Sequence, residues 1–101
     1  MRKYLLTLYV AGQTARSQSA ITNLRRICEE VFASEDYDLR IVDVLERPEA
    51  AERARILATP TLIRELPLPA RCIIGDLSDS HHVIAWIDPQ WHTTEKKEEI
   101  A

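Results

Sequence analysis

The sequence predicts a single α/β domain, and three observations support this. Residues 3–10 form a nearly continuous apolar run, as in a strand that is covered on both faces. Residues 15–33 repeat apolar side chains at helical spacing, and residues 37–45 change from alternating to apolar, as a second strand does. Strand, helix and strand in this order make a βαβ unit with a right-handed crossover. The length of 101 residues suits one domain.

The helix over residues 15–33 is the clearest of these elements. Gly12 ends the strand before it, and the side chain of Thr14 or Ser17 can cap its first turn. Charged residues fill the positions between the apolar ones, so one side of the helix faces solvent. The predicted buried stripe consists of Ala20, Ile21, Leu24, Ile27, Cys28 and Val31.

The second half of the chain is punctuated by prolines. Pro48 suits the first turn of a short helix, where its missing N–H is not needed. A strand is expected after Pro60, and another over residues 70–76, ending in a turn at Gly75. Pro89 ends the last element, and residues 92–101 are expected to form a charged, frayed tail after a domain spanning 1–91.

One segment near the C-terminus has two interpretations. Residues 83–87, VIAWI, are all apolar and rich in β-branched and aromatic types, which favours a strand. Ser78 or Asp79 just before them is a good helix cap, which favours a helix. Periodicity alone does not decide a run this short.

Composition excludes several classes of function. The net charge of −3 and the pI of about 5.6 provide no basic face for nucleic acid. No signal peptide and no apolar stretch long enough to span a membrane are visible. The two cysteines, Cys28 and Cys72, are far apart and too few for a disulfide-dependent secreted protein. We expect a cytoplasmic protein with reduced thiols.

The order of elements resembles the thioredoxin fold: βαβ, then a helix, two strands and a final helix. That fold has a cis-proline before its third strand, so Pro60 is a candidate cis-proline, with a trans surface loop as the alternative. Thioredoxin chemistry needs Cys-x-x-Cys at the start of the first helix. Residues 11–17, AGQTARS, contain no cysteine. Redox catalysis is therefore not expected, and Cys28 and Cys72 are interpreted as core residues.

Nothing in the sequence predicts a cofactor. His81 and His82 are adjacent, and His92 and Cys72 lie at spacings unlike those of structural zinc sites. With only two glycines, the chain also has no phosphate-binding loop of the Gly-rich type. We expect no metal and no nucleotide cofactor.

Five blocks in order resemble the circadian clock protein KaiB. They are LYVAG at 8–12, IVDVL at 41–45, ILATPTL at 56–62, LPLP at 66–69 and IIGDLSD at 73–79. The resemblance extends from about residue 4 to about residue 88. It implies a non-enzymatic regulator that binds the hexameric ATPase KaiC and modulates its phosphorylation cycle, in circadian timing or in stress adaptation. It also implies a homo-oligomer, dimer or tetramer.

KaiB proteins are known to switch between two folds, and the resemblance brings both to this chain. The thioredoxin-like order βαβαββα is the first expectation, and the ground-state order βαββααβ is the alternative. The two interpretations of residues 83–87 are compatible with such a switch, since two packings need differ by only a few kcal/mol. Cyanobacterial members have a Gly where this chain has Trp86, which commits that element more strongly to one structure.

The resemblance also implies the residues that contact a partner. They are Tyr9, Arg55, Arg71, Asp79 and Asp88. Three of them have a structural alternative: Tyr9 as a core residue, Asp79 as a helix cap, and Asp88 as a solvated carboxylate at a helix end. For Arg71 and Asp79, stabilisation of the oligomer is a further alternative. Arg55 stands where the cyanobacterial members have Lys, which keeps the charge and changes the geometry.

Binding of KaiA is not expected. Cyanobacterial members engage KaiA through the edge strand near residue 38, and here that strand carries Asp36 and Asp38. Charges on an edge strand oppose the addition of another strand. The alternatives to a KaiC regulator are a thioredoxin-like redox module and a sensor module of the kind fused to histidine kinases.

Overall fold

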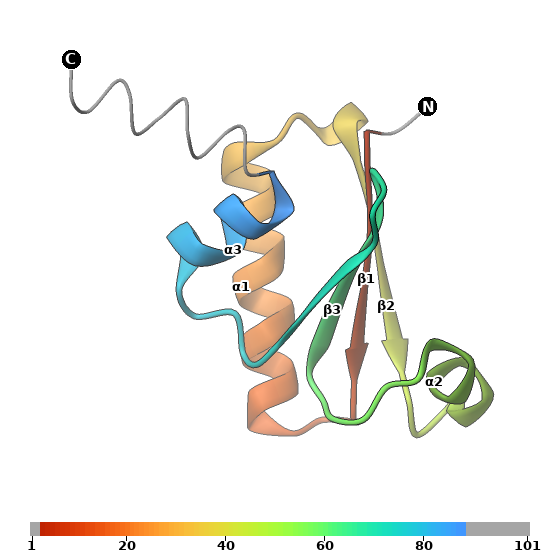
Figure 1. The fold of residues 1–101 in the computed structure, drawn as a ribbon. Helices are drawn as coiled ribbons and strands as arrows, with labels where there is room; N and C mark the ends of the chain where they lie inside the picture. Colours follow the sequence, from red (N-terminus) through yellow and green to blue (C-terminus); the bar gives the residue numbers. More distant parts are fainter. Residues whose placement is uncertain (1–2, 89–101) are drawn as a thin grey trace, which may run out of the picture.

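The computed structural model describes residues 3–88, which form a four-stranded sheet and three α-helices (Figure 1). The order of elements is βαβαββα, so the thioredoxin-like order is the one found and the alternative order βαββααβ is not. The predicted end of the element at Pro89 and the tail 92–101 lie outside the described residues. The elements are β1 (Tyr4–Val10), α1 (Ala15–Val31), β2 (Tyr37–Asp43), α2 (Pro48–Ala54), β3 (Thr61–Leu66), β4 (Arg71–Ile74) and α3 (Ser80–Ile87), with a 3₁₀ turn at Ser34–Asp36.

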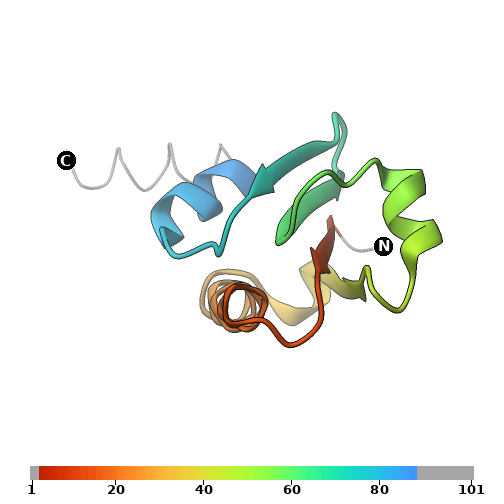
Figure 2. The ribbon, with the colours of Figure 1, turned by 90° about the horizontal axis from the view of Figure 1, so that it is seen from below.

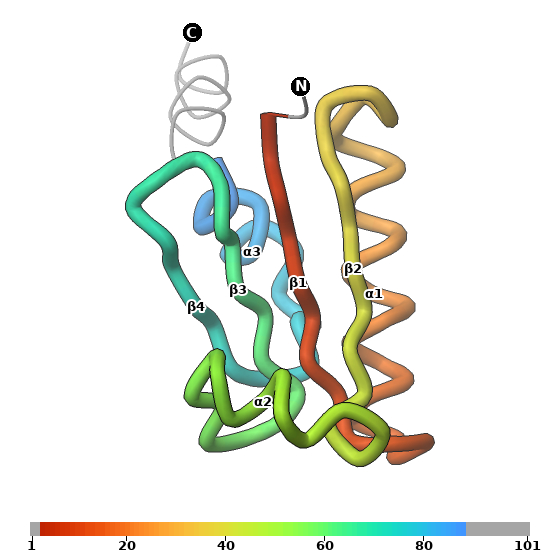
Figure 3. The backbone as a smooth tube through the Cα atoms, turned by 90° about the vertical axis from the view of Figure 1, so that its right-hand side faces the viewer, coloured from red at the N-terminus to blue at the C-terminus, as the bar shows by residue number. Residues whose placement is uncertain are grey.

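The strands lie in the order β2-β1-β3-β4 (Figure 3). β1 pairs in parallel with β2, as the predicted βαβ unit requires, with Leu6 opposite Leu39. β3 runs antiparallel to β1, and β4 antiparallel to β3. β2 and β4 therefore form the two edges of the sheet.

Helices α1 and α3 cover one face of the sheet, and α2 lies against the other (Figures 1 and 2). The core lies between the sheet and helices α1 and α3, because the strands point alternate side chains to that face. Its buried members are Tyr4, Leu6, Leu8, Val10, Ala20, Leu24, Ile27, Cys28, Leu62, Leu77, Val83, Ile84, Trp86 and Ile87. No described helix is long and apolar enough to cross a membrane.

Helix α1 follows the predicted pattern at its start and ends earlier than predicted. The Thr14 hydroxyl accepts a hydrogen bond from the Ser17 N–H at 3.2 Å, which satisfies one free N–H of the first turn. The helix stops at Val31 because Phe32 turns extended, and its ring packs 4.9 Å from that of Tyr4. Ile21 and Val31, predicted as buried, are only partly buried against the core.

Residues 83–87 are helical, which decides between the two interpretations of this segment. The Asp79 carboxylate accepts a hydrogen bond from the His82 N–H at 3.2 Å and caps α3. Val83, Ile84, Trp86 and Ile87 are buried, so apolar contact with α1 and the sheet outweighs the strand preference of these residue types. Leu77, just before the cap, has φ of +63° and is buried.

Candidate functional site

The first candidate surface surrounds α2, which has no buried residue of its own. Between α2 and the sheet is a shallow hollow of about 390 Å³ that is lined by Tyr9, Ala50, Arg53, Ala54 and Glu65. Tyr9 is only 8% exposed, and burial raises the pKa of its phenol. The Glu65 carboxylate raises this pKa further, and Arg53 lowers it. Glu65 accepts a hydrogen bond from the Thr7 hydroxyl.

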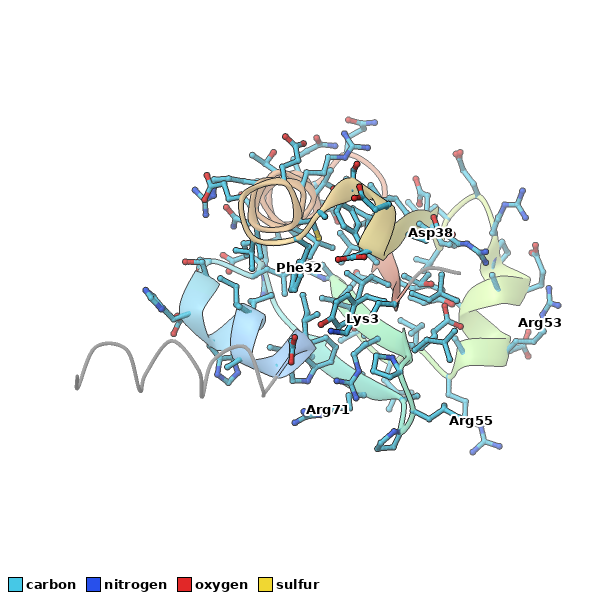
Figure 4. The ribbon with its side chains drawn as sticks, turned by 90° about the horizontal axis from the view of Figure 1, so that it is seen from above. Lys3, Phe32, Asp38, Arg53, Arg55 and Arg71 are labelled. Atoms are coloured by element: carbon cyan, nitrogen blue, oxygen red, sulfur yellow. The ribbon has the colours of Figure 1, made fainter. Side chains whose placement is uncertain are left out.

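Arg55 ends α2 in a conformation that usually belongs to glycine. Its φ and ψ are 57° and 46°, in the left-handed region. Its N–H bonds to the carbonyls of Ala51 and Glu52, and the Ile56 N–H bonds to the Ala51 carbonyl at 2.9 Å. This is a Schellman-type ending, which uses only the backbone of Arg55. The guanidinium is exposed and extends away from the body of the protein (Figure 4).

The loop after Arg55 is anchored at Pro60. The Thr59–Pro60 bond is cis, as are Leu66–Pro67 and Leu68–Pro69. Pro60 is buried, and its carbonyl accepts a hydrogen bond from the Gly75 N–H at 3.0 Å. The Thr61 hydroxyl donates to the Ala58 carbonyl at 2.6 Å. These two hydrogen bonds hold the loop at Ala58 and Pro60, next to the start of β3.

The second candidate surface lies at the C-terminal end of α3. Arg64, on β3, is only 5% exposed, and its two terminal nitrogens donate to the carbonyls of Ile87 and Pro69, each at 2.9 Å. Its Nε has no partner among the described residues. Burial lowers the pKa of this guanidinium, and the nearby charge of Arg71 lowers it further.

Two further contacts fix the same end of α3. The Tyr4 hydroxyl donates to the Asp88 carboxylate at 2.5 Å, and burial together with Asp88 raises the pKa of Tyr4. Arg71 lies 6.0 Å from the centre of the Trp86 ring, and it also donates weakly to the Trp86 carbonyl at 3.4 Å. A cation beside the last carbonyls of a helix stabilises its negative end.

The five predicted contact residues are not brought together in one site. Tyr9 and Arg55 lie around α2, whereas Arg71 and Asp88 lie at the end of α3. Asp79 lies at the opposite end of α3, where it caps the helix. Whether any of the five contacts a partner stays a prediction.

Sequence reasoning missed two residues that stand out in the structure. Arg64 occupies the core-facing position two residues after Leu62, so the strand alternation already pointed it inward. Leu57 is 96% exposed, although it belongs to an apolar run, ILATPTL, that reads as buried. Nothing in the local pattern distinguishes it from Leu62, the other leucine of this run, which is fully buried.

The position of the thioredoxin cysteine motif is occupied by a hydrogen-bonded turn. Gly12 has φ of +64°, and its N–H donates to the Asp43 carboxylate at 3.1 Å. Leu45 donates to the same carboxylate oxygen at 2.9 Å, which joins the ends of β1 and β2. The cysteines lie elsewhere, and both are free thiols. Cys28 is buried in α1, as predicted, whereas the prediction of Cys72 as a core residue is wrong, because β4 is an edge strand that leaves this side chain exposed.

The described residues contain no cluster of three or more His, Cys, Asp and Glu that could hold a metal ion. His81 and His82 lie exposed in the first turn of α3, and His92 lies outside the described residues.

Comparison with known proteins decides the family. The family model described as the KaiB domain matches residues 7–89. The chain belongs to the KaiB family. Its alignment with the circadian clock protein KaiB3 of Synechocystis sp. is 46% identical over 88 residues and covers 87% of this chain and 85% of that protein. The chain is 49% identical over 87 residues to the clock oscillator protein KaiB of Synechococcus elongatus, covering 86% of this chain and 84% of that one.

Solved structures support the thioredoxin-like fold of this KaiB-family chain. The N-terminal domain of Synechococcus elongatus SasA superimposes with a TM-score of 0.71 and 26% identity, covering 89% of this chain and 88% of that one. Mitochondrial thioredoxin 3 of Saccharomyces cerevisiae also gives 0.71, covering 88% and 80%, with 18% identity. The second similarity concerns the fold alone.

Proposed function

We propose that this protein is a non-catalytic regulator that binds a KaiC-type hexameric ATPase and modulates its phosphorylation cycle, in circadian timing or stress adaptation. The observation that carries the proposal is the match of residues 7–89 to the KaiB domain. The relatives at 46% and 49% identity are named as circadian clock proteins, which supports the same role.

The α2 surface supports binding rather than catalysis. It combines a partly open hollow beside Tyr9 with the exposed guanidinium of Arg55, whose side chain the fold does not use. Backbone conformations that are costly for their residue type tend to persist at functional positions. The segment 11–17 lacks the cysteine pair that redox catalysis on this fold requires, which argues against a thioredoxin-like enzyme.

Binding to KaiA is not part of the proposal. The edge strand β2 carries Asp38 and Arg40, 3.8 Å apart, and these charges oppose the addition of a strand from a partner. Asp36, predicted on the same strand, lies in the 3₁₀ turn just before it. We further propose that the protein is cytoplasmic and that its free form is a dimer or tetramer.

Pull-down of the KaiC-type ATPase from the same genome, with ATP and with ADP, tests the proposal. We expect a complex to form over hours at micromolar concentration and to change the phosphorylation state of the ATPase. If neither nucleotide supports a complex after a day of incubation, the proposal is wrong.

Arg55→Gly is expected to stabilise the fold and to weaken binding of the ATPase. Glycine removes the left-handed strain, and after its own entropic cost the free energy of unfolding should rise by about 0.5 kcal/mol. Loss of the guanidinium should weaken binding on the order of tenfold. Urea unfolding and a binding titration measure the two effects.

Arg25→Gly on the exposed side of α1 is the matched control, because it makes the same chemical change inside a helix. It should lower the free energy of unfolding by about 1 kcal/mol and leave binding unchanged. If Arg55→Gly binds as tightly as the wild type, Arg55 is a structural residue only.

A sensor module of the histidine-kinase type is the second candidate. The similarity to the SasA N-terminal domain, at 26% identity and a TM-score of 0.71, favours it. The two candidates differ in output: a regulator acts as a free chain on the ATPase, whereas a sensor module acts through a kinase. The test uses a strain from which the gene for this protein has been deleted. If expression of this chain alone restores normal phosphorylation of the ATPase in that strain, the first candidate is supported.

A further inference from the structure

Leu57 is the most exposed large apolar side chain among the described residues. It is 96% exposed, against 75% for Leu68, 71% for Leu45, 59% for Ile74 and 37% for Leu66. A leucine in this position contributes no burial to the described fold. Burying it against another molecule would remove its apolar surface from water, which is favourable.

An apolar hollow of about 200 Å³ adjoins Leu57. It lies between the residue that follows β2, helix α2 and the loop that precedes β3, and only one of its residues is polar. Its lining consists of Val44, Ala51, Ile56, Leu57, Ala58 and Thr59.

The backbone that carries Leu57 is fixed at both ends. The Schellman-type ending of α2 holds Arg55 and Ile56, and the hydrogen bond from Thr61 to the Ala58 carbonyl holds the other side. A loop that is already ordered loses little conformational entropy on binding. Leu57 is therefore presented in a preorganised position.

The charges beside Leu57 define the chemistry of the partner. Arg53 and Arg55 project outward at the C-terminal end of α2 (Figure 4), and neither has an ion pair with a carboxylate among the described residues. Arg53 makes one weak bond, from its Nε to the Glu49 carbonyl at 3.4 Å. The acidic residues of this helix, Glu49 and Glu52, precede the arginines, so the two charged residues nearest to Leu57 along the chain are both basic.

We propose that Leu57 is the apolar anchor with which this protein binds its partner. The partner offers an apolar recess whose rim carries Asp or Glu side chains that pair with Arg53 and Arg55. This inference rests on the proposed function, since the partner is the KaiC-type ATPase. Aromatic or aliphatic anchors in a pocket, surrounded by polar contacts, supply most of the energy of many protein interfaces.

Leu57→Ser tests the anchor, with Leu68→Ser as its matched control. Leu68 is also highly exposed, and it lies in the β3–β4 turn, at the end of the sheet opposite α2 (Figure 3). Leu57→Ser should weaken binding of the ATPase at least tenfold in a titration by interferometry, whereas Leu68→Ser should stay within about twofold of the wild type. Circular dichroism should show both variants folded.

A double charge reversal tests the acidic rim. Arg53→Glu with Arg55→Glu should weaken binding, and the wild-type affinity should fall with added salt. Arg25→Glu with Arg26→Glu makes the same change in charge on α1, which covers the other face of the sheet (Figure 2), and should have little effect.

The outcomes separate the anchor from the proposed function. If the wild type does not bind the ATPase, both proposals are wrong. If it binds but Leu57→Ser binds equally well, the anchor is wrong and the function stands. If Leu57→Ser instead abolishes self-association in light scattering without changing ATPase binding, a second copy of this chain covers Leu57 and the proposed partner is wrong for this site.

Discussion

Replacing Arg64 with alanine is expected to lower the free energy of unfolding by about 3 kcal/mol. The change removes two charged hydrogen bonds, to the carbonyls of Ile87 and Pro69, and leaves both carbonyls without this donor. It also empties the space filled by a side chain that is only 5% exposed. Removal of a buried cation whose Nε is unpaired offsets some of this cost.

Two further variants separate the sources of this effect. Arg64→Met keeps the apolar stem and removes the donors, so its destabilisation, about 1–2 kcal/mol, reports the hydrogen bonds. Arg71→Ala removes a neighbouring guanidinium that is exposed and lies over the Trp86 ring, and it should cost less than about 1 kcal/mol.

Urea unfolding measures these energies, and hydrogen exchange locates them. The Asp88 N–H, which bonds to the Ile84 carbonyl at the end of α3, should exchange faster in Arg64→Ala than amides in the middle of α1. If Arg64→Ala is as stable as Arg71→Ala, Arg64 does not hold α3 against the sheet.

The first half of the fold follows from local patterns in the sequence. The apolar stripe of α1, the Thr14 cap and the βαβ crossover depend on near neighbours and on the right-handed rule, and the structure confirms them. The end of α1 was placed two residues too late, because Phe32 leaves the helix to pack against Tyr4. That contact joins distant parts of the chain, and periodicity does not reveal it.

The second half depends on contacts that no local pattern specifies. The sequence did not decide whether residues 83–87 form a strand or a helix. Burial of Ile84 and Trp86, together with the Asp79 cap, selects the helix. Arg64 reaches α3 across 23 positions of sequence, and Tyr4 reaches Asp88 across 84. Whether this half also adopts a second packing stays a prediction.

The candidate surfaces were only partly accessible to sequence reasoning. Arg55 was singled out by the family resemblance, but its left-handed conformation is a property of the backbone. Leu57 was missed because exposure of an apolar residue depends on where the loop runs after α2 ends. Both features appear only when the turn at the end of α2 is known.

The thiols of Cys28 and Cys72 are expected to differ in reactivity by about three orders of magnitude or more. Burial raises the pKa of Cys28 to about 12, with a smaller contribution from Glu29. At pH 8 the folded protein then holds roughly one part in ten thousand of this thiol as thiolate. Cys72 is exposed on β4, so a thiol reagent reaches it directly.

Titration with a disulfide reagent such as Ellman's compound measures this difference. One thiol should react quickly in the native protein, and the second only after unfolding in guanidinium; in Cys72→Ser the fast phase should vanish. The raised pKa of Cys28 also makes the free energy of unfolding depend on pH. The pKa of Cys28 is higher in the folded than in the unfolded protein, so the stabilisation from the protonated thiol is fully present below about pH 8.5 and is lost as the pH rises toward 12. Two thiols that react at similar rates in the native protein would show that α1 does not bury Cys28.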